Sequence, residues 1–228
     1  MGNNNLYNDI ESLIIKSGLD RESGALIYSA LKTLHPSNIY FLGINPGGVP
    51  DQNSTILDHF RFMRQNPDFN EYCDGVWSPG GNTMPKGQSI LQKRIQYLLS
   101  SLAINTRYVF GSNLIFKRSK SEQEIKQNFK IWAEKCWSLH EKFLSIVDPS
   151  VIIILGNNGF EFLKGKIINN SELSYFKTDH GQGWMCKHLT GDILDKKRNI
   201  IMIPHLSRFA INNISNRPII DWIKSILN

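Results

Sequence analysis

The chain is poor in cysteine and has no long apolar run. Its 228 residues include three cysteines, Cys73, Cys136 and Cys186, which are far apart and show no CxxC or His/Cys spacing. This number excludes a four-cysteine iron–sulfur cluster, and the spacing predicts no zinc site. No apolar stretch reaches the roughly 20 residues that span a membrane. Free thiols and the absence of a signal peptide lead us to expect a reducing, cytoplasmic location.

The sequence also lacks a P-loop, a GxGxxG motif, internal repeats and low-complexity tracts. What it contains is an ordinary globular composition, 41% hydrophobic and 20% charged. A chain of this length can bury a substantial core without disulfides, so we expect a single domain over residues 1–228. The formal net charge of +6 favours a polyanionic partner, although a merely basic globular protein would carry the same charge.

Helix-like and strand-like patterns alternate along the chain. The expected helices are 6–17 and 22–34 (the N-terminal helices within 1–36), 54–65, 88–103, 122–147, 157–164 and 217–227. The expected strands are 38–44, 107–116, 151–155, 173–177, 184–189 and 199–203. Such alternation predicts an α/β fold, a three-layer α/β/α sandwich with a central, mostly parallel sheet covered on both faces.

Two apolar strands end in polar loops rich in Gly or Pro. The first is followed by Gly43-Ile44-Asn45-Pro46-Gly47-Gly48, and the second, Ile200 to Ile203, by Pro204-His205-Leu206-Ser207-Arg208-Phe209. Ligands of open α/β sheets bind outside the carboxyl ends of the strands. The two loops therefore predict one site, to which both ends of the domain contribute.

These clusters resemble the motifs of the uracil-DNA glycosylase superfamily. Gly43-Ile44-Asn45-Pro46-Gly47 is similar to the first motif of the mismatch-specific, thymine-DNA and single-strand-selective monofunctional glycosylases. His205-Leu206-Ser207 resembles the second motif, His-Pro-Ser, with Leu in place of Pro, and Ser112-Asn113-Leu114 resembles a strand whose Asn reads the base. The resemblance runs in order over roughly residues 38–228.

The resemblance implies a uracil-DNA glycosylase-like fold and a monofunctional DNA glycosylase. Such an enzyme hydrolyses the N-glycosidic bond of a flipped pyrimidine, uracil or a C5-modified base, and leaves an abasic site. It implies DNA as the partner, a monomer, and no metal, iron–sulfur cluster or redox cofactor. No Lys occupies a motif position to form a Schiff base with the sugar, which favours a monofunctional enzyme.

The catalytic candidates are Asn45 and His205. Asn45 would position the attacking water with its side-chain carbonyl, but it lacks the negative charge of an Asp, so we expect slower chemistry than in Asp-bearing members. His205 would donate a hydrogen bond to the base oxygen that gains charge. A turn role for Asn45 and a capping or core role for His205 are the alternatives. Leu206 in place of Pro predicts a less rigid loop.

The base-binding candidates are Asn113, Trp77 and Gly47. Asn113 can present a donor and an acceptor to a base edge, or it can be a satisfied structural Asn. Trp77 would stack on the base, with Tyr72 and Phe60 as rivals. Gly47 has no side chain, which would leave space beside C5 for thymine-like, 5-hydroxymethyl or larger bases, unless it only serves the turn.

The DNA-binding candidates are the remaining motif residues. Ser207, Arg208 and the backbone amides of Gly47 and Gly48 would contact phosphates. Phe209 would be the wedge that fills the gap of the flipped nucleotide, or equally a core Phe. The basic run 117–120 is more typical of a solvated loop.

The sequence leaves two rival functions and two biological roles open. One rival is a non-catalytic nucleic-acid-binding module with the same pocket. The other is an α/β enzyme in which Gly47 and Gly48 hold the phosphate of a free nucleotide, although no P-loop supports it. A glycosylase could serve base-excision repair or defence against phage with modified DNA.

Overall fold

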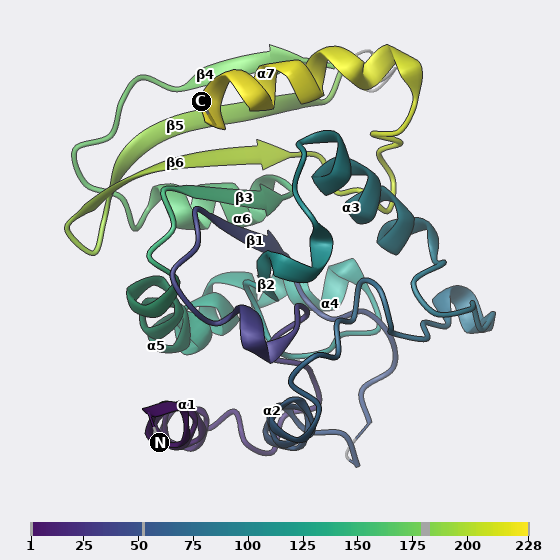
Figure 1. Ribbon diagram of the computed structural model, residues 1–228, viewed down its shortest axis with the longest axis vertical. Helices are drawn as coiled ribbons and strands as arrows, with labels where there is room; N and C mark the ends of the chain where they lie inside the picture. The colour runs from purple at the N-terminus through teal and green to yellow at the C-terminus, as the bar shows by residue number, and fades with distance from the viewer. Residues whose placement is uncertain (1, 52, 179–182, 228) are drawn as a thin grey trace.

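One six-stranded sheet forms the centre of the molecule. The computed structural model describes residues 2–51, 53–178 and 183–227. The sheet order is β2-β1-β3-β6-β5-β4, in which β2, β1, β3 and β6 are parallel and β5 and β4 are antiparallel to their neighbours (Figure 1). The strands are β1 (Ile39–Gly43), β2 (Phe110–Asn113), β3 (Val151–Leu155), β4 (Ser174–Lys177), β5 (Met185–Ile193) and β6 (Lys196–Ile203).

The central strands are short and apolar because helices cover them on both faces. All residues of β1 and β3 are buried, as expected for the inner strands of a parallel sheet. Side chains alternate between the two faces: Tyr40 and Leu42 join one core cluster, and Ile39 and Phe41 join the other.

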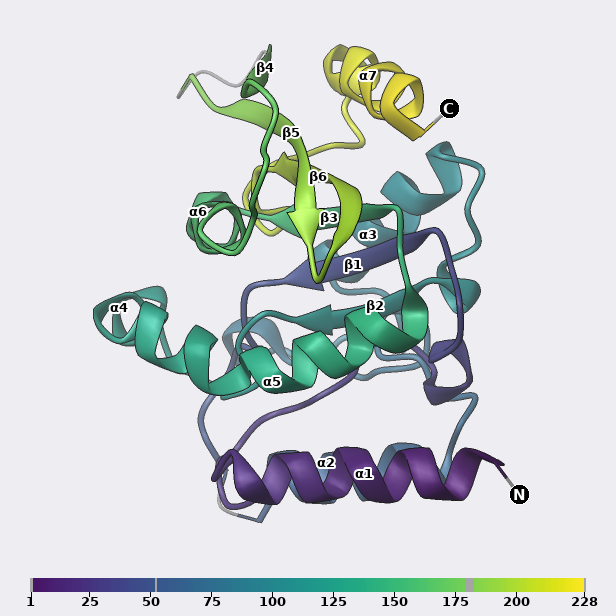
Figure 2. The same ribbon diagram turned by 90° about the vertical axis from the view of Figure 1, so that its left-hand side faces the viewer.

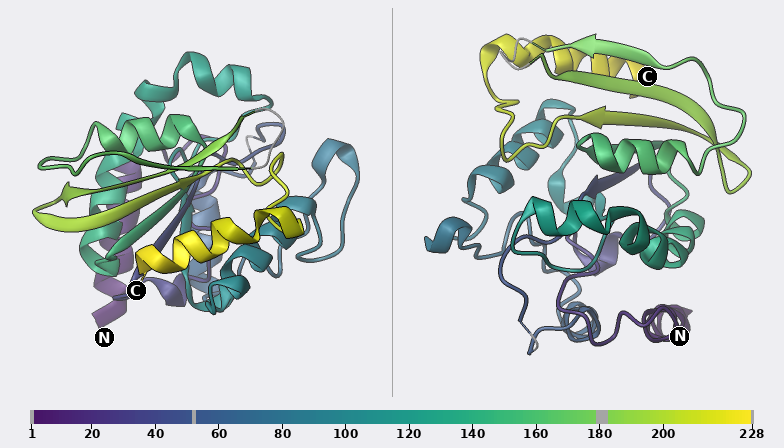
Figure 3. Two further views of the ribbon diagram at one scale, coloured as in Figure 1. Left: turned by 90° about the horizontal axis from the view of Figure 1, so that it is seen from above. Right: turned by 180° about the vertical axis from the view of Figure 1, so that it is seen from behind.

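The helices form a layer on each side of the sheet. The first cluster includes side chains of α1 (Gly2–Lys16), α2 (Ile56–Gln65), α4 (Glu122–Gln127), α5 (Phe129–Val147) and α6 (Asn157–Lys164). The second includes those of α3 (Ile90–Ser101) and α7 (Arg217–Leu227). Figures 2 and 3 show α5 and α6 on one face, α3 and α7 on the other, and α1 and α2 beyond the β2 edge. The fold is α/β, and its layers agree with the predicted sandwich.

Most predicted elements are confirmed to within a few residues. Two of the helices begin at capping residues that can be recognised in the sequence. Thr55 and Asp58 form a capping box at the start of α2, and Ser89 and Gln92 form another at the start of α3. Each pair satisfies backbone N–H groups that have no partner within the first turn.

The predicted helix 22–34 is wrong. Only Leu31–Thr33 forms a 3₁₀ turn; the rest consists of bends and isolated bridges to other segments. Ala25 N donates to Phe116 O, while Tyr28 N and Ser29 N both donate to Gly111 O. The segment therefore runs beside β2 and is buried because strands and loops surround it.

Two further predictions were too long. The strand predicted over 107–116 is reduced to Phe110–Asn113, preceded by a 3₁₀ turn at Thr106–Tyr108. The helix predicted over 122–147 breaks at Asn128 into α4 and α5.

The three cysteines are unpaired thiols. Cys136 and Cys186 are fully buried, and burial raises the pKa of each thiol to about 12. Such thiols are unreactive near neutral pH. Within the described part of the chain, no helix is long and apolar enough to cross a membrane.

Candidate active site

Four parallel strands end at one edge of the sheet and bring the motif residues together. Gly43 pairs with Asn113, and a Cβ on Gly43 would lie only 2.0 Å from Asn113 Oδ1, so only glycine allows this approach. A Cβ on Gly156, which follows β3, would lie within 4.0 Å of both Ile44 and His205. The residues that follow β1 and β6 therefore flank β3, and the end of β2 lies beside β1.

The Asn45 side chain is held in one orientation. Its Nδ2 donates to Pro46 O at 2.9 Å and to Ser119 Oγ at 2.8 Å. Ser119 is buried, and its hydroxyl donates in turn to Ser121 O at 3.1 Å. With both amide hydrogens used, Oδ1 is the remaining group, and no described residue donates to it. The half-buried Asn45 thus offers an acceptor at the carboxyl edge of the sheet.

The two glycines after Asn45 are exposed and lie beside Arg118. No atom lies within 4 Å of the Cβ position of Gly47, so a side chain there would extend into open space. Gly48 has a φ of 102°, which favours glycine. Arg118 donates from Nη1 to Gly47 O at 2.6 Å. The basic run at 117–120, predicted as a solvated loop, therefore packs against the first motif.

Asn113 is a buried amide with an unpartnered donor. The residue is 6% exposed, and its Nδ2 has no hydrogen-bond partner among the described residues. Its side chain lies beside the Tyr28 hydroxyl. A buried donor without a partner costs about 1–3 kcal/mol, which a ligand acceptor would recover. This favours base reading over the role of a satisfied structural Asn.

Trp77 belongs to an aromatic cluster beside Asn113. Its ring lies edge-on to Tyr28, with centroids 5.9 Å apart, and its indole Nε1 donates to Glu71 Oε2 at 2.9 Å. Trp77 is half-buried, whereas its rivals Tyr72 and Phe60 are buried in the two core clusters. Of the three aromatic candidates, Trp77 therefore has the most accessible ring.

Glu71 is an ionised carboxylate within this cluster. Burial alone would raise its pKa, but the neighbouring His59, 3.8 Å away, the hydrogen bond from Trp77 and the nearby charge of Arg118 lower the pKa below its usual value. Burial, together with the charge of Glu71, raises the pKa of Tyr28. Tyr28 is therefore a neutral hydroxyl between the carboxylate and Asn113.

The His205 loop fixes the histidine tautomer by local contacts. Ser207 N donates to His205 Nδ1 at 3.3 Å, and Ser207 Oγ lies 2.8 Å from the same atom. Because Nδ1 accepts, the neutral ring carries its proton on Nε2. Arg94 on α3 donates to the carbonyls of Leu206 and Ser207 at 2.7 and 3.1 Å. Leu206, which stands in place of the motif proline, is fully buried, and Arg94 ties its loop to α3.

The structure corrects the wedge prediction for Phe209. Its side chain is 0% exposed and packs against Trp184, with ring centroids 6.3 Å apart. Insertion into DNA would require it to leave the core, at a cost of about 3 kcal/mol. Phe209 is the core residue that the alternative predicted. Ser207 and Arg208, by contrast, are exposed.

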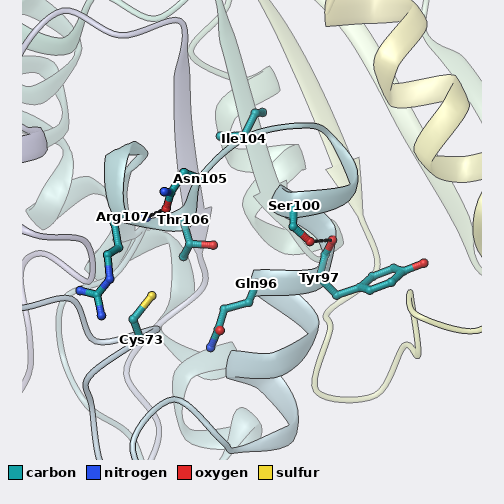
Figure 4. Close-up of a pocket in the computed structure, with 8 residues that line it drawn as sticks. All are labelled: Cys73, Gln96, Tyr97, Ser100, Ile104, Asn105, Thr106 and Arg107. Atoms are coloured by element: carbon teal, nitrogen blue, oxygen red, sulfur yellow. Dashed lines mark hydrogen bonds between the residues drawn. The ribbon is translucent and has the colours of Figure 1, made fainter.

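Two clefts lie near these elements. The larger, about 510 Å³, is lined by Cys73, Tyr97 and Arg107 among others, next to the start of β2 (Figure 4). Its Arg107 is already bound to Asp74 at 2.9 and 2.7 Å, and no predicted site residue lines it. The smaller, about 420 Å³, is lined by His59 and Glu71 and so adjoins the aromatic cluster.

Five residues that contact the site were not predicted. Ser119 and Arg118 contact the first motif, Arg94 contacts the second, Tyr28 lies beside Asn113, and Glu71 accepts from Trp77. None belongs to a motif, and the predicted helix 22–34 concealed Tyr28. The basic run that begins four residues after Asn113 was the one signal that pointed to Arg118.

The site offers amides and one imidazole rather than a metal-binding set. No group of three His, Cys, Asp or Glu side chains comes together within residues 2–51, 53–178 and 183–227. A comparison of this chain with protein-family models finds no match, and a comparison with curated protein sequences finds none either.

Proposed function

We propose that this protein is a monofunctional DNA glycosylase of the uracil-DNA glycosylase type, acting as a monomer in the cytoplasm. One observation carries the proposal: Asn45, Asn113 and His205, from three segments far apart in the sequence, meet at one carboxyl edge of the sheet. A ligand at this edge meets an acceptor, an unpartnered buried donor and an imidazole N–H.

Each group has a role in hydrolysis of the glycosidic bond. Asn113 donates to the edge of the flipped pyrimidine. As the bond breaks, its electron pair moves onto the base, and His205 Nε2–H donates to the oxygen that gains charge. Asn45 Oδ1 orients a water toward the sugar carbon; the water oxygen forms the new bond and its proton passes to solvent.

The surface around the edge suits a phosphate backbone. The chain carries a net charge of +6, and the exposed Ser207, Arg208, Gly47 and Gly48 flank the catalytic residues. Hydroxyls, guanidinium groups and backbone amides are common phosphate contacts, and they position DNA without reading its sequence. The enzyme would act in base-excision repair or in defence against phage with modified DNA.

Abasic-site formation tests the proposal. Purified protein is incubated with single- and double-stranded oligonucleotides carrying uracil, mismatched thymine or 5-modified pyrimidines, and abasic sites are scored by alkaline cleavage. We expect release of at least one pyrimidine without added metal. Salt-dependent DNA binding with no release from any substrate would instead identify a non-catalytic nucleic-acid-binding module of the same fold.

A further inference from the structure

Each of the two motif loops is bound by an arginine that lies outside the motifs. In the first loop, Arg118 donates from Nη1 to Gly47 O at 2.6 Å. In the second loop, Arg94 donates from Nη1 to Leu206 O at 2.7 Å and to Ser207 O at 3.1 Å. The two guanidinium groups are therefore anchored in the same way, through one terminal nitrogen that bonds to loop carbonyls.

Both arginines project from backbone that is itself held in place. Arg118 N donates to Ser23 O at 2.8 Å, and the next residue, Ser119, forms a parallel bridge with Gly47. Arg94 lies within α3, whose buried side chains pack into the second core cluster. A ligand would thus meet two cations that are already positioned, which lowers the entropy lost on binding.

The other edge of each guanidinium has no partner. Within the described part of the chain, Nε and Nη2 of Arg94 and Arg118 form no hydrogen bond, and neither side chain forms an ion pair. Glu71 is influenced by the charge of Arg118 but is not ion-paired with it. By contrast Arg64, which is also half-buried, is ion-paired with Glu11 at 2.9 Å.

This unused edge has the geometry that binds an anion. Nε–H and one N–H of Nη2 point in parallel, and such a fork matches two oxygens of a phosphate. Arg94 and Arg118 are half-buried, and a cation that loses water without gaining an anionic partner is unfavourable. Two anions at this edge would remove the imbalance.

The spacing of the two loops distinguishes a nucleic-acid strand from a small anion. Strand β1 pairs with β3, and β3 pairs with β6, so the loops after β1 and β6 are two strand spacings apart. Two spacings are about 10 Å, more than a single phosphate group can bridge. A DNA strand carries a phosphate at every nucleotide and can reach both arginines, with one nucleotide between them facing Asn45 and His205.

We propose that Arg118 and Arg94 bind two phosphates of one DNA strand, one on each side of the flipped nucleotide. The inference rests on the proposed function, because it takes DNA as the substrate, and it adds two binding residues to that site. Loss of one charge-assisted contact should weaken DNA binding about tenfold.

The salt dependence of binding is the first test. Single- and double-stranded oligonucleotides carry one 2′-fluoro-2′-deoxyuridine, whose electron-withdrawing fluorine slows cleavage of the glycosidic bond, and affinity is measured from about 50 to 200 mM salt. Arg118→Gln and Arg94→Gln should each reduce the slope of log affinity against log salt by about 0.7 to 0.9. Arg118→Lys and Arg94→Lys keep the charge and should keep the slope, whereas a purely structural role would not separate Gln from Lys in this way.

Neutral linkages then locate the two contacts. A methylphosphonate replaces one phosphate at a time around the 2′-fluoro nucleotide, and the affinity of each oligonucleotide is measured. For the wild type, we expect one sensitive position on each side of this nucleotide. Arg118→Gln should abolish the sensitivity on one side and Arg94→Gln on the other, because a contact that is already lost cannot be lost again.

Two matched controls remove a positive charge elsewhere. Arg64→Gln changes a half-buried arginine whose charge is already paired with Glu11. Lys117→Gln changes the residue next to Arg118, which is paired with Glu22 at 2.6 Å. Both should keep the salt slope and the methylphosphonate pattern of the wild type.

The outcomes separate this pair from the catalytic proposal. Base release with unchanged salt slopes in both Gln variants overturns the pair and leaves the glycosylase standing. Reduced slopes in both variants, without base release from any substrate, support the pair and overturn the catalytic proposal. Binding of deoxyuridine monophosphate that depends on only one arginine, without salt-dependent DNA binding, would identify a single-phosphate site and overturn both. Because the two arginines lie in different elements, a folding defect in one variant leaves the other to decide.

Discussion

The two motif loops hold their functional side chains by different means. In the second loop, His205 is oriented by Ser207, two residues away, through a backbone N–H and a hydroxyl. In the first loop, Asn45 is oriented partly by Ser119, which lies 74 residues further along the chain. The tautomer of His205 is thus set by short-range contacts, whereas the orientation of Asn45 requires the chain after β2 to pack against the end of β1.

The two loops should therefore respond differently to substitutions elsewhere in the chain. A change in the segment that follows β2 should reach Asn45 and Asn113 but not the tautomer of His205. Arg94 does link the His205 loop to α3, but it does so through the carbonyls of Leu206 and Ser207 and does not contact the imidazole. Variants can therefore separate the two halves of the site.

The largest effect is expected at Asn45. Asn45→Ala removes the only side-chain acceptor proposed to orient the water, so base release should fall by the order of 10³. DNA binding should remain largely intact, because phosphate contacts come from other groups. Single-turnover rates and duplex affinity are compared with those of Asn157→Ala, an exposed Asn that follows β3. Near-wild-type release by Asn45→Ala would remove this residue from the mechanism.

A similar or smaller effect is expected at His205. Loss of a donor to the developing charge in His205→Ala should slow cleavage by the order of 10²–10³. A base that leaves more readily needs less stabilisation, so the defect should shrink for a substrate with a better leaving group. Rates are measured on uracil and on a 5-halogenated uracil. An equal loss on both would mean that His205 only maintains its loop.

The sequence predicts most of what depends on local patterns. Burial and capping leave short-range signals in the sequence. These signals predict fully apolar strands such as β3, capped helices such as α2, and polar loops after strands. Phe209 illustrates the limit, because an aromatic residue after a motif can be a wedge or a core residue, and only its neighbours decide. Glu71 and Ser119 could not be predicted, since their roles come from contacts between segments far apart in sequence.

Acid should weaken a buried contact next to Asn113. Buried His140 accepts from the Tyr40 hydroxyl and donates to Leu114 O, next to Asn113. Burial lowers its pKa from 6.5 to about 4, despite the hydrogen bond to Leu114 that opposes this. The unfolded chain binds this proton at a higher pH than the folded chain does. The contribution of neutral His140 to the free energy of unfolding is therefore complete above pH 6.5 and falls between pH 6.5 and about 4.

The expected loss from this group between neutral pH and pH 5 is about 2 kcal/mol in the free energy of unfolding. Urea unfolding at the two pH values measures it. His140→Gln should flatten the pH dependence even if it lowers stability overall. An unchanged slope in His140→Gln would show that other groups control the acid response.

The smallest effects come from a pair of serines, and they test the difference between the loops directly. Ser119→Ala removes one of the two acceptors of the Asn45 amide, so the side chain can rotate and release should fall about 5- to 10-fold. Ser207→Ala keeps the backbone N–H that donates to His205 Nδ1, so the tautomer persists and the loss should be about twofold. Single-turnover rates at saturating enzyme separate these effects from any change in DNA affinity, which Ser207→Ala should also lower. The single-turnover rate could instead fall further in Ser207→Ala than in Ser119→Ala. The Ser207 hydroxyl, and not the backbone N–H, would then orient His205, and backbone contacts within the second loop would not suffice to hold the imidazole.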